Sequence, residues 1–124
     1  FAAPVGPFVL AGDANLDPLD GDGRPEALNA LLADPRLNDP RPVSAGGAAA
    51  GDTAQMGDPA IDTADWPKAL PDDPGNLRVD YVLPSASLTI TASGVFWPVA
   101  GEPGAEAAAT ASPHKLVWVE VELP

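Results

Sequence analysis

The sequence predicts an α+β fold with mainly antiparallel or mixed β-strands, one short helix and long loops. Two segments in the second half of the chain carry apolar residues at alternate positions, which is typical of strands that are buried on one face. The chain has 12 Gly and 16 Pro among 124 residues, so long irregular segments are expected. Three Trp, three Phe and one Tyr are few aromatic residues, and they do not favour a helical bundle. The length suits a single domain.

The first third of the chain is expected to contain one strand and one helix. Residues 8–11 are a short apolar run that stops at a glycine, as a buried strand would. Residues 24–33 should form a helix, because their three leucines fall on one face and Pro25 suits the first turn. The Asp34-Pro35 pair should end that helix.

Two loops are expected, at residues 38–75 and at residues 101–111. The Gly- and Ala-rich stretch at 44–51 cannot bury enough apolar surface to offset the entropic cost of ordering, so the longer loop should be mobile. Trp66 is the side chain that is expected to anchor it.

Three strands are expected in the second half. Residues 77–83 place four apolar side chains on one face and Asp80 on the other. Residues 88–97 should form a second strand with a bulge or bend at Ser93-Gly94. The last strand, at residues 116–123, has three valines and a leucine on one face and two glutamates on the other.

Composition excludes several classes of function. The net charge is −12, and the six Lys and Arg residues are scattered singly, so tight sequence-independent binding of nucleic acid is not expected. The absence of cysteine excludes disulfides and thiolate metal sites, and no apolar run is long enough to span a membrane. Because the chain begins at Phe1 without signal-peptide features, we expect a processed protein or the C-terminal part of a longer one.

Two polar residues directly follow the first expected strand and are candidates for catalysis. Asp13 and Asn15 are two residues apart, and Gly12 permits the backbone turn that would bring their side chains together. An aspartate here can accept a proton from water, and an asparagine can donate to a phosphoryl oxygen on which charge develops. Both residues are also common turn formers, so an ordinary turn remains an alternative.

Asp80 and His114 form a second candidate pair. Asp80 interrupts a strand otherwise made of β-forming residues, and His114, the only histidine, directly precedes the last strand. The carboxylate of Asp80 can accept the ring N–H of His114, which would fix the tautomer and raise the basicity of the ring. The alternative is that Asp80 is solvated or paired with Arg78, and that His114 is a structural or exposed histidine.

A calcium-binding module is a further interpretation of the acidic residues. Asp13, Asn15 and a third aspartate match the first three ligand positions of an EF-hand loop. Pro18 then stands where glycine is needed and Arg24 where glutamate is needed, which excludes that site. A looser Ca²⁺ site in the turn at residues 20–23 remains open.

Four segments taken together resemble the C-terminal half of the endonuclease/exonuclease/phosphatase superfamily: residues 12–15, 77–85, 94–98 and 112–119. Their order, spacing and strand context match, and the resemblance covers nearly the whole chain. It implies that residues 1–124 are half of a four-layer α/β sandwich. It also implies hydrolysis of phosphodiesters or phosphomonoesters by activated water, with Mg²⁺, Mn²⁺ or Ca²⁺ as the cofactor.

The resemblance implies a role for each candidate residue. Asp13 would activate or orient the attacking water and share in holding the metal, and Asn15 would contact the scissile phosphate. Asp80 would orient His114, which would stabilise the phosphoryl oxygens in the transition state.

Two departures from the family pattern bear on activity. Pro113 occupies the position of a metal-associated aspartate, and proline can neither ligate a metal through its side chain nor donate an N–H. The family's metal-binding glutamate has no counterpart, so we expect a half-domain that binds its other half or self-associates and is inactive alone. The alternative is an inactive member of the fold that serves as an interaction module. The acidity favours a small or lipid-like phosphoester over nucleic acid as the substrate.

Overall fold

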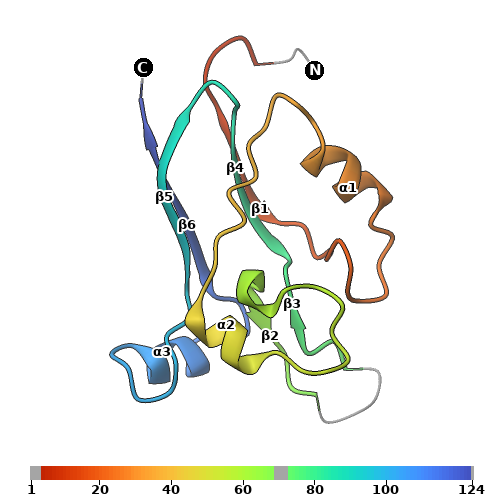
Figure 1. Cartoon of the computed structure of the whole chain (residues 1–124), viewed down its shortest axis with the longest axis vertical. Coiled ribbons are helices and arrows are strands. Elements are labelled where there is room, and N and C mark those ends of the chain that lie inside the picture. Colours follow the sequence, from red (N-terminus) through yellow and green to blue (C-terminus); the bar gives the residue numbers. More distant parts are fainter. Residues whose placement is uncertain (1–3, 69–72, 124) are drawn as a thin grey trace.

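The computed structural model describes residues 4–68 and 73–123, and its helices and strands form an α+β arrangement (Figure 1). The predicted fold class is therefore confirmed. The described strands pair antiparallel, two by two: β1 (Val9–Asp13) with β4 (Asp80–Pro84), β2 (Ala64–Asp65) with β3 (Asn76–Leu77), and β5 (Thr89–Phe96) with β6 (Leu116–Glu122).

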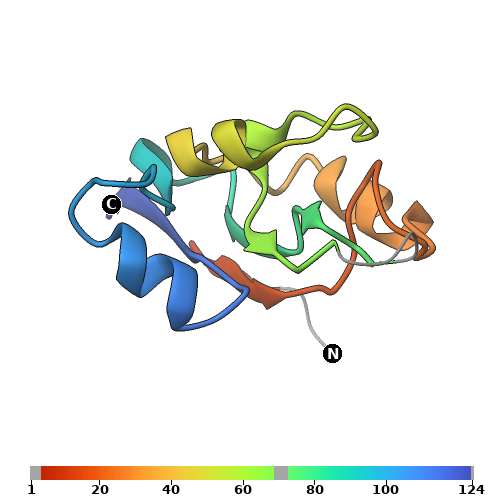
Figure 2. The ribbon, with the colours of Figure 1, turned by 90° about the horizontal axis from the view of Figure 1, so that it is seen from below.

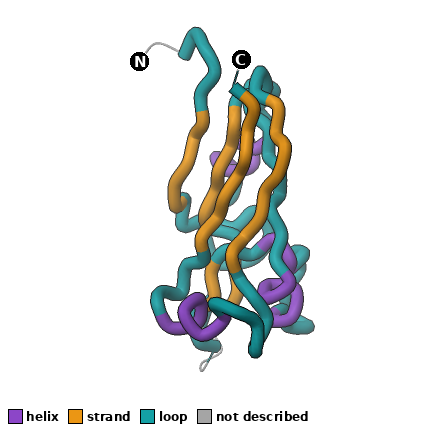
Figure 3. The backbone as a smooth tube through the Cα atoms, turned by 90° about the vertical axis from the view of Figure 1, so that its left-hand side faces the viewer, coloured by secondary structure: helices purple, strands orange, loops and turns teal. Residues whose placement is uncertain are grey.

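Four of these strands run side by side along the long axis of the molecule. β4 lies next to both β1 and β6, and β6 pairs with β5 (Figure 3). β1 ends, and β4 and β6 begin, at the end of the strands that lies away from both chain termini (Figure 1). The polar residues at these three positions are thereby brought to one region of the fold.

Helix α1 (Glu26–Leu32) packs against β4. The strand expected at residues 8–11 is present as β1, but it is exposed along its whole length rather than buried. Leu28 is buried against Tyr81 and Leu83 of β4, and the other leucines of the helix are partly buried around them. The predicted helix is confirmed, although Pro25 lies at the N-cap rather than inside the first turn. The alternation predicted for residues 77–83 is confirmed as well, because all four apolar side chains on the predicted inner face are buried.

The segment at residues 38–75, which was expected to be mostly one long loop, contains three short elements of regular structure. Helix α2 (Ala45–Ala50), the 3₁₀ helix η1 (Pro59–Ile61) and strand β2 interrupt it, and residues 69–72 of the expected loop lie outside the described residues. The Gly- and Ala-rich stretch forms a helix because Gly46 and Gly47 are buried and allow close packing. A Cβ atom on Gly46 would overlap both the indole and the carbonyl oxygen of Trp97.

The expected loop at residues 101–111 also contains a helix, α3 (Ala105–Thr110). Lys115 stabilises its C-terminal end, where carbonyl groups lack partners within the helix. The Nζ atom of Lys115 donates to the carbonyl oxygen of Ala108 at 2.9 Å and lies over the ring of Trp97. Helices α2 and α3 lie on opposite sides of the strands (Figure 2).

The strand predicted at residues 77–83 is divided into β3 and β4. The backbone N–H of Arg78 donates to Oδ2 of Asp17 at 2.6 Å, and that of Val79 donates to Oγ1 of Thr63 at 3.0 Å. These two N–H groups therefore bond to side chains instead of to a neighbouring strand. This local exchange of partners separates the two strands.

The bulge expected at Ser93-Gly94 lies instead between Ile90 and Ala92. Gly94 has a different role, because the indole of Trp118 on β6 packs across it. A Cβ atom at this position would lie 2.8 Å from the indole ring. The predicted facing of the last strand is confirmed for its three valines, which are half-buried between exposed residues, whereas Leu123 follows β6 and is 81% exposed.

Among the residues that the structure describes, no helix is long and apolar enough to cross a membrane.

Candidate active site

Three of the four predicted site residues meet at the end of the central strands. Asp13 and Asp80 are direct partners in the β1–β4 pair, and paired residues of antiparallel strands project on the same face. His114 precedes β6, which lies beside β4. One potential ligand atom from each of these residues lies within 4.8 Å of the other two.

His114 is hydrogen-bonded to Asp80. Its Nδ1 atom lies 3.0 Å from Oδ2 and 3.3 Å from Oδ1 of the carboxylate. The histidine side chain is 34% exposed and the aspartate 19%, so the pair is partly shielded but open to solvent on one side. The contact has the geometry that the sequence predicted for a carboxylate that orients an imidazole ring.

Backbone bonds to the segment before and within β2 fix the position of His114. Ala64 forms a bridge with His114, and the N–H of Asp65 donates to the carbonyl oxygen of Pro113 at 3.0 Å. The Trp66 ring packs edge-to-face with the imidazole, with 5.2 Å between the ring centroids. Trp66 thus contacts the candidate site. It also anchors its own segment, because it packs against the buried cluster of Ala64, Leu77 and Val79.

Asn15 is held beside Asp13 through its backbone. Its N–H donates to Oδ1 of Asp13 at 2.8 Å, and its φ angle of 49° is in the left-handed region that asparagine tolerates. Within the described part of the chain its exposed side-chain amide has no hydrogen-bond partner. The backbone of these two residues therefore forms the turn that one interpretation of the sequence expected. The side-chain amide of Asn15 remains available to bind a ligand.

The donor atoms of the cluster fit a divalent cation that is held by few protein ligands. Mg²⁺ is usually bound through one or two carboxylates together with water and substrate phosphates. Asp13 is exposed and offers a carboxylate, whereas Oδ2 of Asp80 already accepts bonds from Thr63 and His114. Pro113 contributes no side-chain ligand, and its carbonyl oxygen accepts the N–H of Asp65. The residues present therefore fit an open site at Asp13 and do not form a closed cage.

One interpretation of the sequence paired Asp80 with Arg78, but the structure does not form this pair. The side chain of Arg78 is 2% exposed, and its guanidinium donates to both carboxylate oxygens of Asp39, at 2.5 and 2.8 Å. Burial raises the pKa of Asp39, but the hydrogen bonds and charge of Arg78 outweigh it and hold that pKa below its ordinary value. The guanidinium also lies 4.6 Å from the centre of the Tyr81 ring. Arg78 therefore does not compete with His114 for the carboxylate of Asp80.

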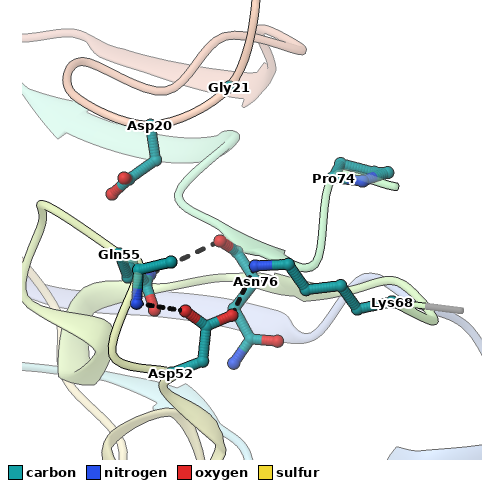
Figure 4. Close-up of a pocket in the computed structure, with 8 residues that line it drawn as sticks. Asp20, Gly21, Asp52, Gln55, Lys68, Pro74 and Asn76 are labelled. Carbon is teal, nitrogen blue, oxygen red and sulfur yellow. Dashed lines mark hydrogen bonds and ion pairs between the residues drawn. The ribbon is translucent and has the colours of Figure 1, made fainter. Parts of the chain in front are cut away.

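A polar pocket of about 180 Å³ lies between the loops that carry Asp20 and Asp52 and the start of β3 (Figure 4). Its polar side chains have partners within the pocket: Lys68 pairs with Asp52 at 2.5 Å, and the Gln55 side chain donates to the backbone carbonyl oxygen of Asn76. Asp20, from the turn considered for Ca²⁺, accepts two backbone N–H groups from residues 56 and 57, each at 2.8 Å. The carboxylate of Asp20 thus connects two loops.

Sequence reasoning missed one residue of the site, Thr63. Its hydroxyl contacts the carboxylate and the backbone N–H of Asp80, each at 2.9 Å. It lies 17 residues before Asp80 in a segment that was expected to be loop, and a single threonine there carries no distinctive signal.

No curated protein and no solved structure matches the chain at a significant level. A family comparison does give a match, which covers residues 1–114 and so ends at His114. The matched segment contains Asp13, Asp80 and His114, the three residues that converge in the fold. On this match the chain belongs to the Endonuclease/Exonuclease/phosphatase family.

Proposed function

We propose that this chain provides part of the active site of a phosphoesterase that hydrolyses phosphodiesters or phosphomonoesters by activated water. The observation that carries the proposal is the hydrogen bond between His114 and Asp80 directly beside Asp13. Membership of a family of nucleases and phosphatases supports the same class of reaction.

Each residue has a role that follows from its position. Asp13, exposed at the end of β1, orients the attacking water and accepts its proton. Asn15 donates its free amide to a phosphoryl oxygen. Asp80 holds the His114 ring, whose second nitrogen faces the phosphoryl group and stabilises the charge that develops there.

The proposed cofactor is Mg²⁺ or Mn²⁺, with Ca²⁺ as the alternative, held by Asp13 together with water and substrate oxygens. When bound, such a cation supplies positive charge that stabilises the phosphoryl oxygens. The proposed substrate is a small or lipid-like phosphoester. The net charge of −12 supports this choice, because it would repel a long nucleic-acid backbone.

The proposed partner is the other half of the domain or a second copy of the chain. Phe96, Leu116 and Trp118, on the exposed face of β5 and β6, are 45%, 67% and 41% exposed. Large apolar side chains that are grouped on a strand pair favour association.

Hydrolysis of bis(p-nitrophenyl) phosphate by the protein that contains this chain tests the proposal. Activity should require a divalent cation and should fall about 100-fold or more in either site variant. Asp13→Ala loses the group that accepts the proton of the attacking water, and His114→Ala loses the group that stabilises the phosphoryl charge. Glu122→Ala, which removes an exposed carboxylate at the end of β6 that lies away from His114, is the matched control and should keep full activity. Activity that survives both site substitutions would rule out the assigned site.

Pro113→Asp provides a second arm of the same experiment. Aspartate restores a carboxylate beside His114 and keeps the carbonyl oxygen that bonds to Asp65, so metal-dependent activity should rise. An unchanged rate would mean that the metal is held elsewhere. A wild-type protein that shows no hydrolysis with any of the three cations would support the non-catalytic alternative, an interaction module with the same fold.

A further inference from the structure

Thr63 occupies a position from which one hydroxyl group contacts three atoms near the candidate site. The residue is 1% exposed and lies directly before β2. Its Oγ1 atom is 3.0 Å from the backbone N of Val79, 2.9 Å from the backbone N of Asp80 and 2.9 Å from Oδ2 of Asp80.

The direction of each of these bonds follows from the atoms involved. A threonine hydroxyl has one proton and two acceptor lone pairs. The two backbone N–H groups can only donate, so they take both lone pairs. The hydroxyl proton is therefore directed to Oδ2 of Asp80, and the orientation of this side chain is fixed without any choice of rotamer for the hydrogen.

This arrangement determines what His114 can do. The same Oδ2 atom lies 3.0 Å from Nδ1 of His114. An ionised carboxylate only accepts hydrogen bonds, so Nδ1 carries the proton in this contact. Nε2 is then the nitrogen that is available to a substrate, and it can donate to a phosphoryl oxygen when it also carries a proton.

The backbone of Thr63 is fixed from both sides by the segments that carry the site. Its N–H donates to the carbonyl oxygen of Leu77 at 3.0 Å, and its carbonyl oxygen accepts the N–H of Lys115 at 2.7 Å. Leu77 lies just before Asp80 in the chain, and Lys115 directly follows His114. The hydroxyl is thus held in register with both members of the pair.

We propose that Thr63 is a positioning residue that fixes the Asp80 carboxylate and, through it, holds His114 as the Nδ1–H tautomer with Nε2 facing the substrate. The proposal deepens the proposed function and rests on it for the catalytic consequence, but the tautomer itself can be measured without any activity. Thr63 is not a catalytic residue, since its hydroxyl is buried and bonded only to protein atoms.

Nitrogen chemical shifts of the imidazole ring, measured on this 124-residue chain, provide the test, because the chain contains a single histidine and the signals need no assignment. With the ring in its neutral form, the wild type and Thr63→Ser should show the Nδ1–H tautomer. Thr63→Val keeps the shape but lacks the hydroxyl, and its ratio of Nδ1–H to Nε2–H should fall by about fivefold, the equivalent of one net hydrogen bond. A folded Thr63→Val protein with the wild-type ratio would overturn the proposal.

Asp80→Asn keeps the test decisive if Thr63→Val does not fold, because its outcome also depends on Thr63. If the hydroxyl directs its proton to the position of Oδ2, the amide oxygen of the asparagine must occupy that position, and His114 stays Nδ1–H. A switch to Nε2–H in Asp80→Asn would contradict the proposal, since it would mean that the amide is free to turn its NH₂ group toward the ring.

The kinetic arm separates positioning from a purely structural role. Thr63→Val should lower kcat about 10- to 100-fold with little change in KM, and Thr63→Ser should restore it. An equal loss in both variants would refute positioning by the hydroxyl. If His114→Ala leaves hydrolysis unchanged while the tautomer behaves as expected, the proposed function fails and the structural part of this inference stands.

Discussion

Asp62 is a buried carboxylate, 2% exposed, that lies directly before Thr63 in the chain. Burial raises its pKa to about 7; a hydrogen bond from Gln55 opposes this shift, and the negative charges of three nearby aspartates add to it. Between about pH 4 and pH 7 the folded protein therefore keeps a proton on Asp62 that the unfolded chain, in which the pKa of this carboxyl is 3.8, has already released. This difference stabilises the fold fully below about pH 4 and is lost as the pH rises through 7.

Asp62→Asn should remove this pH dependence, because the amide is neutral at every pH and can still accept the bond from Gln55. At pH 8 the free energy of unfolding of the variant should exceed that of the wild type by about 2–4 kcal/mol, since each unit of pKa shift corresponds to about 1.4 kcal/mol. At pH 4 the two should be equal. Urea denaturation at both pH values measures the difference, with Asp22→Asn as the exposed control. A difference that does not change with pH would contradict the prediction.

Single residues could be predicted where their neighbours in the sequence defined the environment. Asp80 was a candidate because it interrupts a strand of clear alternation, and His114 because it directly precedes another; the structure brings them together. The pairing of Arg78 with Asp39 and the contact of Thr63 with Asp80 could not be predicted. Each joins residues that are distant in sequence, through a segment without periodicity, and only the packing of the loops sets those distances.

Among the elements, α2 has the least support from the sequence. Its Ser44 cap accepts the N–H of Gly47 at 3.0 Å, and two glycines form its buried face. Glycine is unfavourable inside helices, and a Gly- and Ala-rich stretch offers little apolar surface. The helix exists because a surface without side chains can approach Trp97 closely, and periodicity of apolar residues does not report this kind of packing.

Gly46→Ala tests which effect dominates in α2. Intrinsic propensity favours alanine over glycine by about 1 kcal/mol in a helix, so the substitution would stabilise an isolated helix. Here the added Cβ would overlap the backbone carbonyl of Trp97, and we expect the free energy of unfolding to fall by about 1–3 kcal/mol. Thermal or urea denaturation measures the change, and Ala49→Ser, on the exposed face of the same helix, is the control. A neutral or stabilising Gly46→Ala would show that α2 does not pack in this way.

The helices and strands that were predicted correctly share one property. α1, β4 and β6 each have one face that is more buried than the other, so the period of their apolar residues reports their structure. β3 and β4 are separated because the backbone N–H groups between them donate to the side chains of Asp17 and Thr63 instead of to carbonyl oxygens of a neighbouring strand. Such an exchange of hydrogen-bond partners depends on contacts across the fold, so it cannot be predicted from the alternation of apolar residues along a single segment.

At the scale of the whole molecule, two opposing properties control association. Phe96 and Leu116 are paired across β5 and β6, and with Trp118 they form an exposed apolar patch. The net charge of −12 opposes contact between two copies. Charge repulsion between exposed groups acts over about 30 Å at 10 mM salt but only about 10 Å at 0.1 M, whereas the attraction between apolar surfaces is not screened.

The chain should therefore associate more strongly as the salt concentration rises. Sedimentation equilibrium should give a weight-average mass near that of the monomer, 12.6 kDa, at low ionic strength, and a larger mass when salt screens the repulsion. Leu116→Thr removes apolar surface from the centre of the patch and should lower the mass at high salt. Val5→Thr removes an even more exposed apolar side chain that lies outside the patch and should have no effect. A chain that stays monomeric at every salt concentration would show that the patch is too small to hold a second copy, and the other half of the domain would remain as the proposed partner.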